Sequence, residues 1–375
     1  MKILSLSIKN FRNYKQQKAD FHPEVNVIVG YNAQGKSNLL EAINYLSFFS
    51  SFRNARDMDM VRWGQSYFFI EGLIKKTVGE YHLSLGYNVD NKKVLKINGN
   101  QQKKVSDLLG VFNSVVFSPE DLNIVKTGPA ARRKYLDKEM IQLFPSYYYT
   151  LLEYQKILTQ RNNLLKEIRE NKNKKEMLEI WNRQLINKGS RIIKKRLDVL
   201  QKLAPLARLS HRKITNGEED LDINYESLAL NQEKNLKNCS LEDIEAIFSL
   251  QLEKHFQMEI YRGITLIGPH RDDLKLAING VDVRKYGSQG QQRTTALSLK
   301  IAELELVKSE TGEYPVLLLD DVMSELDESR RNHLLLFIGN KVQTFITTTD
   351  LTFKQKGKIF FISQGEIKET ESFPK

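Results

Sequence analysis

Cysteine is almost absent from this chain, since Cys239 is the only one among 375 residues. A single cysteine excludes an intramolecular disulfide and suits a reducing compartment such as the cytosol. No apolar run approaches the roughly 20 residues that a membrane-spanning helix needs. The first eight residues alternate like a strand and lack the solid apolar block of a secretory signal. We therefore expect a cytoplasmic protein with no membrane partner.

Acidic residues are too few to balance the basic ones. Lys and Arg number 57 against 46 Asp and Glu, which gives a net charge of +11 and a pI near 9.3. A protein this basic often binds a polyanion, and nucleic acid is the first candidate. An ordinary lysine-rich solvated surface has the same composition, so charge alone leaves both interpretations open.

A glycine-rich segment, residues 30–37, fits the P-loop pattern G-x-x-x-x-G-K-S. An apolar strand precedes it and an amphipathic helix follows, which is the order that the motif requires and which argues against a chance match in a surface turn. In such a loop the backbone N–H groups surround phosphate oxygens, the lysine reaches the β and γ phosphates, and the serine hydroxyl binds Mg²⁺. The predicted ATP-binding residues are Gly30, Tyr31, Asn32, Ala33, Gln34, Gly35, Lys36, Ser37 and Asn38.

A second apolar strand, residues 315–319, ends in Asp320 and Asp321, which is the Walker B pattern. Its unbroken apolar run is typical of a strand buried in a parallel sheet, beside the P-loop strand. We expect Asp320 to bind Mg²⁺ together with Ser37. We expect Lys36 and Asp321 to be catalytic, Asp321 by orienting or deprotonating the attacking water.

Three further segments resemble motifs of the ABC ATPase superfamily. Ser288 is a natural helix N-cap, and Ser288, Gln289, Gly290 and Gln291 resemble the signature motif, which in that superfamily binds the γ-phosphate held by the opposite subunit. Ser324 and Asp327 resemble the D-loop at the dimer interface. The strand after them has no histidine where the superfamily has its switch histidine, so γ-phosphate sensing falls to Thr348, Thr349 or Asp350.

Most of the chain separates the P-loop from the Walker B strand, which predicts a nucleotide-binding fold split by a large insertion. Residues 118–262 are highly charged and largely helical, and their apolar stripes predict a short antiparallel helical arm with a hinge at 171–175. A strand pattern returns at residues 263–268, before a charged loop at 269–273. Either a functional loop or a solvated β-turn explains that charge.

The fold class that follows is α/β. We predict an ABC-type P-loop ATPase head, with a mixed sheet and an antiparallel β region, and an inserted α-helical arm lobe. The head comprises residues 1–117 and 263–375, and the second lobe comprises residues 118–262. We assign the signature region, residues 286–307, to the head, although its sequence is also compatible with packing against the second lobe.

Basic residues gather after the P-loop helix, in a partly aromatic stretch. Arg53, Arg56 and Arg62 are candidate contacts for nucleic-acid phosphates, and a solvated loop with local ion pairs explains them equally well. Lys75 and Lys76 lie in the predicted antiparallel strands. They are weaker candidates for DNA binding, because lysines commonly protect edge strands from pairing.

Six segments in the same order resemble the RecF family of recombination mediator ATPases, which is related to the Rad50 and SMC heads. They cover the whole chain and lie at residues 6–14, 35–43, 117–122, 268–273, 288–293 and 319–321. The chain departs from the usual pattern at Ala33, where glycine is common, and at Asp321, where the wider superfamily usually has glutamate. Because the aspartate side chain is shorter than that of glutamate, it lies further from the attacking water. We therefore predict slow hydrolysis, with a turnover below about 10 s⁻¹, the median for enzymes.

The resemblance implies a weak, DNA-dependent ATPase that uses ATP and Mg²⁺ and dimerises on ATP binding. It implies binding to duplex DNA, gapped DNA and single–double strand junctions, partnership with RecR and with RecO, and a place at the nucleoid. Two other functions remain open on the sequence. One is the ATPase subunit of a transporter, but the basic charge and the helical arm argue against it. The other is a structural DNA clamp that uses ATP only as a ligand.

Overall fold

The computed structural model describes residues 1–90, 92–170, 175–230, 239–350 and 357–370. It divides the chain into two compact units. Unit 1 comprises Met1–Leu122 and Leu299–Lys375, and unit 2 comprises Asn123–Ser298. The predicted lobe boundary at residue 263 does not coincide with this division, because residues 263–298 lie in unit 2. No helix in the described ranges is long and apolar enough to cross a membrane.

The first sheet of unit 1 is antiparallel, with strand order β2-β1-β4-β5-β6-β7. Its strands alternate buried and exposed residues, as expected for a sheet with one covered face. An Asn-Gly hairpin turn lies between β6 and β7, where Asn98 and Gly99 have φ values of 50° and 81°. The strands are β1 (Lys2–Phe11), β2 (Tyr14–Asp20), β4 (Tyr67–Lys76), β5 (Gly79–Asn88), β6 (Lys92–Ile97) and β7 (Asn100–Gln102).

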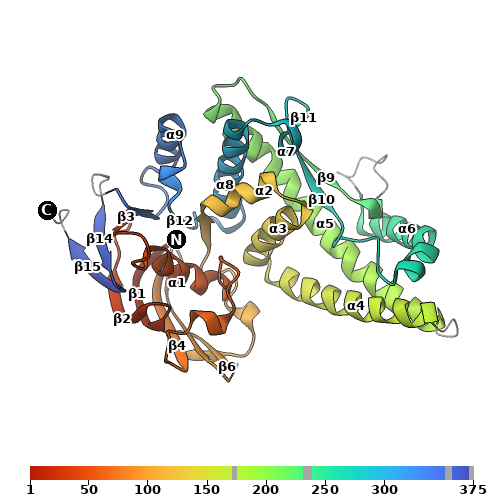
Figure 1. The fold of residues 1–375 in the computed structure, drawn as a ribbon, viewed down its shortest axis with the longest axis horizontal. Coiled ribbons are helices and arrows are strands. Elements are labelled where there is room, and N and C mark those ends of the chain that lie inside the picture. The colour runs from red at the N-terminus through yellow and green to blue at the C-terminus, as the bar shows by residue number, and fades with distance from the viewer. Residues whose placement is uncertain (91, 171–174, 231–238, 351–356, 371–375) are drawn as a thin grey trace. The chain divides into compact units, whose positions relative to one another are not determined.

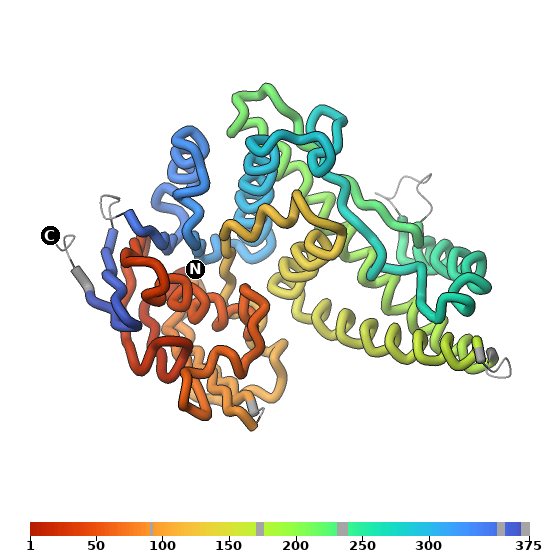
Figure 2. Tube along the Cα trace, in the orientation of Figure 1, coloured from red at the N-terminus to blue at the C-terminus, as the bar shows by residue number. Residues whose placement is uncertain are grey.

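The second sheet of unit 1 joins the two ends of the chain, in the order β15-β14-β3-β13-β12-β8. Its strands are parallel except for the β14–β15 hairpin. Figure 2 shows the red N-terminal and blue C-terminal segments side by side where β3 pairs with β14. The strands are β3 (Val25–Val29), β8 (Ser114–Phe117), β12 (Val316–Leu319), β13 (Thr344–Thr348), β14 (Lys358–Ser363) and β15 (Glu366–Thr370).

Helix α1 (Lys36–Phe48) begins directly after the P-loop and contacts strands of both sheets, including β4 and β8 (Figure 1). It is buried almost all round, as its apolar and small residues require. Helix α9 (Glu328–Ile338) follows the Walker B strand. The mixed sheet and the separate antiparallel sheet that the sequence predicts are therefore both present, with the P-loop helix packed on each of them.

Unit 2 is mainly helical. The predicted antiparallel arm is formed by α4 and α5, which pack along Leu164, Leu165, Ile168 and Leu178. Helix α5 is longer than predicted, because it continues through Pro205. Of the hinge predicted at residues 171–175, residues 171–174 lie outside the described residues, and Lys175 is the first residue of α5. The helices are α2 (Leu122–Lys126), α3 (Pro129–Leu143), α4 (Pro145–Glu170), α5 (Lys175–Ile214), α6 (Leu241–Arg262), α7 (Val283–Tyr286) and α8 (Gln289–Thr311), the last of which ends in unit 1.

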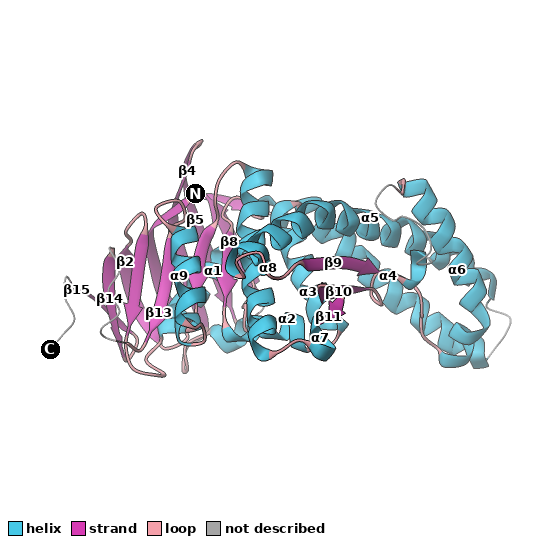
Figure 3. Ribbon diagram, turned by 90° about the horizontal axis from the view of Figure 1, so that it is seen from above, coloured by secondary structure: helices cyan, strands magenta, loops and turns pink. Residues whose placement is uncertain are grey.

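A small antiparallel sheet of order β11-β10-β9 lies beside α5 in unit 2 (Figure 3). It comprises β9 (Leu221–Glu226), β10 (Asp273–Ile278) and β11 (Val281–Asp282). Because β10 pairs with β9, the segment after residue 263 belongs with the inserted lobe. The strand predicted at residues 263–268 is wrong: this segment is irregular, and its polar groups bind side chains of α4 and α6 instead of a neighbouring strand.

Candidate nucleotide site

The P-loop connects β3 to α1 and has the backbone shape that its glycines allow. A Cβ at Gly30 would lie 2.4 Å from the carbonyl oxygen of Ile362, and Gly35 has φ of +118°. Ala33 also lies in the left-handed region, with φ of 64°. Non-glycine residues are uncommon there, which explains physically why glycine is common at this position in related loops. The tight turn that the motif requires is present.

Lys36 is buried at the start of α1, with only 4% of its surface exposed. Its Nζ donates hydrogen bonds to the carbonyl oxygens of Gly30 at 2.8 Å and Tyr31 at 3.1 Å. Burial lowers the pKa of Lys36, and the nearby carboxylates of Asp321 and Asp320 oppose that change. The ammonium is therefore held against the loop and close to the Walker B acids, within one unit.

The turn between β1 and β2 braces the P-loop, which the sequence analysis missed. Asn13 Nδ2 donates to the carbonyl of Gln34 at 2.8 Å, and the Tyr14 hydroxyl donates to the carbonyl of Gly35 at 2.9 Å. Asn38 Nδ2 donates in turn to Asn13 Oδ1 at 2.9 Å. The segment at residues 6–14, used only as a family signature, thus has a structural role.

A buried carboxylate on α1 holds the same turn in place. Arg12 donates two hydrogen bonds to Glu41, at 2.8 and 2.9 Å, and Glu41 is fully buried. Ser51 also donates to Glu41. Bidentate arginine–carboxylate pairs fix geometry as well as charge. The only sequence signal for these contacts was the presence of asparagine, arginine and glutamate near the P-loop. Which of them pair depends on contacts between separate segments.

The Walker B acids follow β12, whose four residues are all buried. The Thr347 hydroxyl, on the neighbouring strand β13, lies 3.1 Å from Asp320 Oδ1 and accepts the backbone N–H of Asp321 at 2.9 Å. Asp320 is only 6% exposed. Thr347 therefore orients both acids. The sequence predicted the γ-phosphate sensor among the three residues that follow it, Thr348, Thr349 and Asp350.

Arg53 lies at this site, although the sequence analysis considered it as a DNA contact. Its guanidinium approaches Asp320 Oδ2 and Asn38 Oδ1, each at 3.3 Å. It therefore contacts one residue of each nucleotide motif. Arg53 remains about one-third exposed, so the same guanidinium is also accessible from solvent.

The environment of Asp321 suits a proton acceptor. Burial raises the pKa of the Asp321 carboxyl, Lys36 lowers it, and the adjacent Asp320 raises it further. A carboxylate with a raised pKa is a better general base near neutral pH. Asp321 also has φ of 53°, a left-handed conformation that aspartate tolerates better than most residues.

The residues predicted to hold Mg²⁺ offer oxygen donors only. Asp320 supplies a carboxylate next to the P-loop helix that carries Ser37, and hard oxygen ligands suit this ion. Within the described residues no group of three or more His, Cys, Asp or Glu side chains could hold a metal by itself.

The signature segment caps α8 in unit 2, as predicted. The Ser288 hydroxyl accepts the N–H of Gln291 at 3.1 Å, and Gln291 Oε1 accepts the N–H of Ser288 at 2.9 Å. Gln291 also donates to Glu219, whose carboxylate lies 3.0 Å from His211 on α5. Ser288 and Gln289 are exposed and Gly290 is partly exposed, so the helix N-terminus that they form is rigid and accessible.

The other predicted interface and switch residues lie near the Walker B strand. The Ser324 hydroxyl donates to the carbonyl of Asp321 at 2.8 Å, and Asp327 caps α9. Thr348 is the last residue of β13, and its hydroxyl accepts the N–H of Asp350 at 3.0 Å. Thr349 is exposed, like Asp350. At this strand end the Thr347 hydroxyl contacts the acids.

The remaining predicted basic residues have mixed surroundings. Arg56 precedes a short 3-10 helix (Asp57–Met60), and Arg62 is partly exposed. Lys75 lies opposite Glu80 across the β4–β5 pair, while Lys76 lies 5.9 Å from the ring centre of Tyr81. Because β4 lies between β1 and β5, it is an interior strand, and the prediction that these lysines protect a sheet edge is wrong.

The charged loop at residues 269–273 is partly buried and held by side chains from other elements, with Asp272 buried and Arg271 exposed. Arg196 donates to the carbonyl of Pro269 at 2.7 Å, and Tyr225 donates to the buried Asp272. Arg132 forms two hydrogen bonds with Asp273, at 2.7 and 2.8 Å. Burial raises the pKa of Asp272 to about 6. The loop is therefore the centre of a buried polar network in unit 2.

His270 in this loop predicts a pH dependence of stability. Its Nδ1 lies 2.7 Å from the Tyr154 hydroxyl and its Nε2 lies 3.2 Å from the carbonyl of Thr265. Since the carbonyl must accept, Nε2 carries a proton, and in the neutral ring Nδ1 accepts from the Tyr154 hydroxyl. Burial lowers the pKa of His270 to about 4 from its ordinary 6.5.

A base with a lowered pKa stabilises the fold above its unfolded pKa, and this stability is lost as pH falls from 6.5 towards 4. We expect the wild type to lose about 2 kcal/mol relative to His270→Gln between pH 7 and pH 5. Urea unfolding of both proteins at the two pH values measures this. Asp272 changes stability in the opposite direction in both proteins, so the comparison isolates the histidine. Parallel pH profiles would contradict the assignment.

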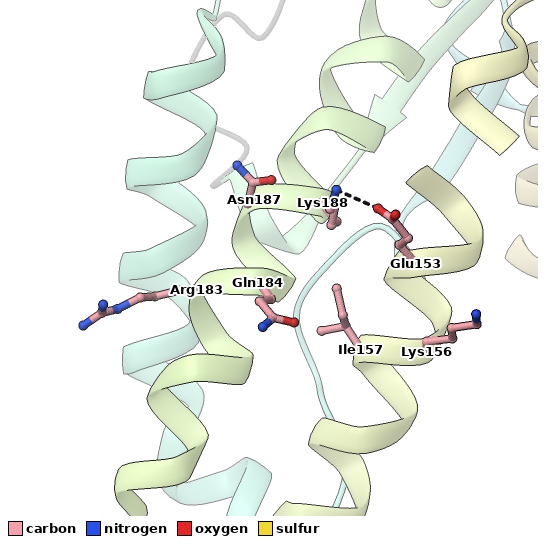
Figure 4. Close-up of a pocket in the computed structure, with 7 residues that line it drawn as sticks. All are labelled: Glu153, Lys156, Ile157, Arg183, Gln184, Asn187 and Lys188. Atoms are coloured by element: carbon pink, nitrogen blue, oxygen red, sulfur yellow. Dashed lines mark ion pairs between the residues drawn. The ribbon is translucent and has the colours of Figure 1, made fainter. Parts of the chain in front are cut away.

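A groove of about 480 Å³ lies between α4 and α5, lined by Glu153, Lys156, Ile157, Arg183, Gln184, Asn187 and Lys188 (Figure 4). Its charges are largely paired locally. Lys188 lies 2.6 Å from Glu153 across the groove, and Arg183 lies 2.6 Å from Glu179 on the same helix. The groove contains no cluster of catalytic groups, and the chemistry of the chain remains at the P-loop.

Known proteins resemble this chain over nearly its whole length. Residues 2–368 match the family described as the RecF/RecN/SMC N terminal domain. The DNA replication and repair protein RecF of Halothermothrix orenii is 49% identical over 351 residues, covering 93% of this chain and 92% of the relative. RecF of Bacillus cereus is 47% identical over 352 residues, covering 94% and 92%.

Solved structures agree. The recombination mediator protein RecF-ATPrS of the RecFOR pathway is 42% identical and has a TM-score of 0.92, covering 98% of each chain. The corresponding RecF-ATP structure has a TM-score of 0.91 at 42% identity, covering 98% of this chain and 97% of that one. An Smc head domain from Pyrococcus furiosus, 17% identical with a TM-score of 0.54, covers 98% of this chain and 95% of its own, and shows the shared ABC ATPase head fold alone.

Proposed function

The chain belongs to the RecF family, and from that premise we propose that it is an ATP-dependent, DNA-binding recombination mediator. One observation carries the proposal. Lys36 and Asp320, from opposite ends of the chain, meet in unit 1 with Asp321 and Thr347 beside them. The solved relatives named for ATP and ATPrS have this fold at 42% identity.

In the proposed reaction, the P-loop N–H groups and Lys36 bind the phosphates of ATP. Ser37 and Asp320 would hold Mg²⁺, which would neutralise charge on the phosphates. Asp321 accepts a proton from the attacking water, and Thr347 keeps Asp321 and Asp320 in position through its hydroxyl. Arg53 contributes positive charge beside Asp320. Hydrolysis is slow, because the short Asp321 side chain reaches less far towards the water than glutamate would.

We propose that ATP binding closes a homodimer, in which Ser288 of each copy reaches the γ-phosphate held by the other. Two observations support this. Ser288 is exposed at the N-terminus of the long helix α8, and helix N-termini favour phosphate groups. In this dimer Ser324 and Asp327 lie at the same interface. Thr348, Thr349 or Asp350 senses the presence of the γ-phosphate.

The DNA ligand is proposed to be a duplex next to a gap or a single–double strand junction. The net charge of +11 supports a polyanionic ligand, and the solved relatives are described as mediators of the RecFOR pathway, which supports RecR and RecO as partners. Fluorescence anisotropy with a gapped oligonucleotide tests this, because binding through phosphates weakens steeply as salt increases. Salt-independent binding, or none with ATP and Mg²⁺ present, would refute the proposal.

Ser288→Arg tests the dimer. We expect it to abolish ATP-dependent dimerisation while ATP binding by the monomer is kept, because a bulky cation would fill the phosphate-binding helix end. Light scattering with and without ATP measures the association, and circular dichroism checks that loss of the cap, which costs about 1 kcal/mol, leaves the fold intact. Leu250→Arg, at an exposed position of α6, is the control. Dimers of the Ser288 variant would show that the signature does not act across the interface.

A further inference from the structure

Trp63 is the most exposed large hydrophobic side chain among the described residues, at 94%. Tryptophan is usually well buried, because its large apolar surface is costly to hydrate. We propose that Trp63 is a base-stacking residue, which binds an unpaired base at the single-stranded side of a DNA junction. This rests on the proposed function and assigns a ligand position within it.

The backbone around Trp63 is held firmly. Val61 forms an antiparallel bridge with Phe11 at the end of β1, and the N–H of Arg62 donates to the carbonyl of Asn10 at 2.8 Å. The N–H of Gln65 donates to the carbonyl of Arg62 at 3.0 Å, and Gly64 has φ of +77°. These are the features of a type II turn with Trp63 at its first corner. The indole is therefore presented by a fixed turn anchored on the first sheet of unit 1.

The charges around this turn suit a nucleic acid. Arg62 precedes the indole, and Lys9 lies opposite Phe69 in the pairing of β1 with β4, the strand that begins after the turn. The Lys9 ammonium lies 5.7 Å from the ring centre of Tyr67, the residue that follows the turn. Cations beside an exposed aromatic ring are the combination that binds single strands, with phosphates on the cations and a base on the ring.

The acids near the turn already have partners in unit 1. Asp57 pairs with Lys93 at 2.7 Å and accepts the Tyr45 hydroxyl at 2.6 Å. The Asp59 carboxylate accepts the backbone N–H of Arg56 at 3.0 Å. Lys93 therefore offsets the charge of Asp57, whereas the backbone hydrogen bond to Asp59 fixes that carboxylate and leaves it charged.

An unpaired base fits this surface better than a protein partner does. Interfaces between proteins bury contiguous apolar area, whereas Gly64, Gln65 and Ser66 follow the indole and are exposed. A base within a duplex is already stacked on both faces, so an extra aromatic ring gains little from it. The geometry therefore favours single-stranded DNA or the end of a strand at a junction.

The tryptophan content allows a direct test. The chain has two tryptophans, and the other, Trp181, packs against the arm cluster in unit 2. In Trp181→Phe the emission comes from Trp63 alone, and the difference between wild type and Trp63→Ala reports the same signal without changing the arm. We expect quenching of Trp63 emission by a duplex with a single-stranded overhang, and little quenching by a blunt duplex. Unchanged emission on bound overhang DNA would overturn the proposal.

Affinity provides the second measurement. Trp63→Ala should weaken binding to the overhang DNA about tenfold, the scale expected for loss of one stacked base, and should change blunt-duplex binding less than twofold. Trp63→Tyr should keep most of the affinity, because a phenol ring still stacks. Tyr261→Ala, which removes a 76% exposed aromatic from unit 2, is the control. Failure of the wild type to bind any DNA would instead refute the proposed function.

If Trp63→Ala binds both DNAs like the wild type, the base-stacking role is wrong while DNA binding stands. The variant is then tested for loss of binding to purified RecR. Such a loss, with normal DNA binding, would assign the indole to a protein interface and would equally overturn the proposal.

Discussion

Replacing Asp321 by Asn is expected to lower the rate of ATP hydrolysis on the order of 100-fold or more, the usual contribution of a general base. Asparagine keeps the size of the side chain and tolerates the left-handed φ of 53° at this position. It can still accept a hydrogen bond, but it no longer takes a proton from water. ATP binding should therefore persist while turnover is lost.

Single-turnover hydrolysis with and without DNA measures this effect, and a fluorescent ATP analogue measures binding. Asp321→Glu is the control, because it restores a carboxylate that reaches further towards the water, and we expect it to remain active. Normal hydrolysis by Asp321→Asn would remove Asp321 from the mechanism. A wild type that binds ATP and DNA without hydrolysing would favour the structural clamp over the enzyme.

Replacing Arg161 by Met is expected to destabilise the protein by about 3–5 kcal/mol, because it leaves a buried carboxylate without its cation. Arg161 and Glu259 are both fully buried, and their atoms Nη2 and Oε2 lie 2.6 Å apart. Arg161 also donates to Thr265 at 2.7 Å and to Asn182 at 2.8 Å. One side chain thus joins α4, α5 and α6 to the irregular segment that precedes β10.

Urea unfolding followed by tryptophan emission measures the change, since Trp181 is adjacent to Asn182 on α5 and packs in the arm cluster. The matched control is Arg183→Met, which removes an equally short ion pair with Glu179 from an exposed helix surface. We expect that control to change stability by less than about 1 kcal/mol. In the double variant Arg161→Met with Glu259→Leu, stability should recover in part. Equal effects of the two arginine variants would contradict the argument.

The nucleotide motifs could be predicted because their signals are local. A buried strand, a glycine turn and a helix follow one another at residues 25–48, and Ser288 caps its helix through Gln291, three residues later. The hairpin turns at residues 98–99 and 279–280 have the positive φ values that their Asn-Gly sequences favour. Each of these features depends on only a few neighbouring residues.

Other features could not be predicted, because they depend on distant segments. The alternation at residues 263–268 indicated a strand, but Arg161, Asn162 and Glu259 bind the polar groups of this segment and leave it irregular. Whether the charges of a loop are solvated depends on the segments packed around it, which the sequence of the loop does not predict. In the charged loop that follows, Asp272 is buried while Arg271 is exposed.

The sequence by itself determined the family of this protein, its P-loop, its Walker B acids and the order of its split head, because strand, turn and cap chemistry is local. Only the tertiary structure decided that Arg53 meets Asp320, 267 positions away, and that Thr347 orients the acids. It also revealed that the Trp63 indole is almost fully exposed. The physical reason is that contacts and exposure arise from the packing of distant segments, which short-range sequence patterns do not record.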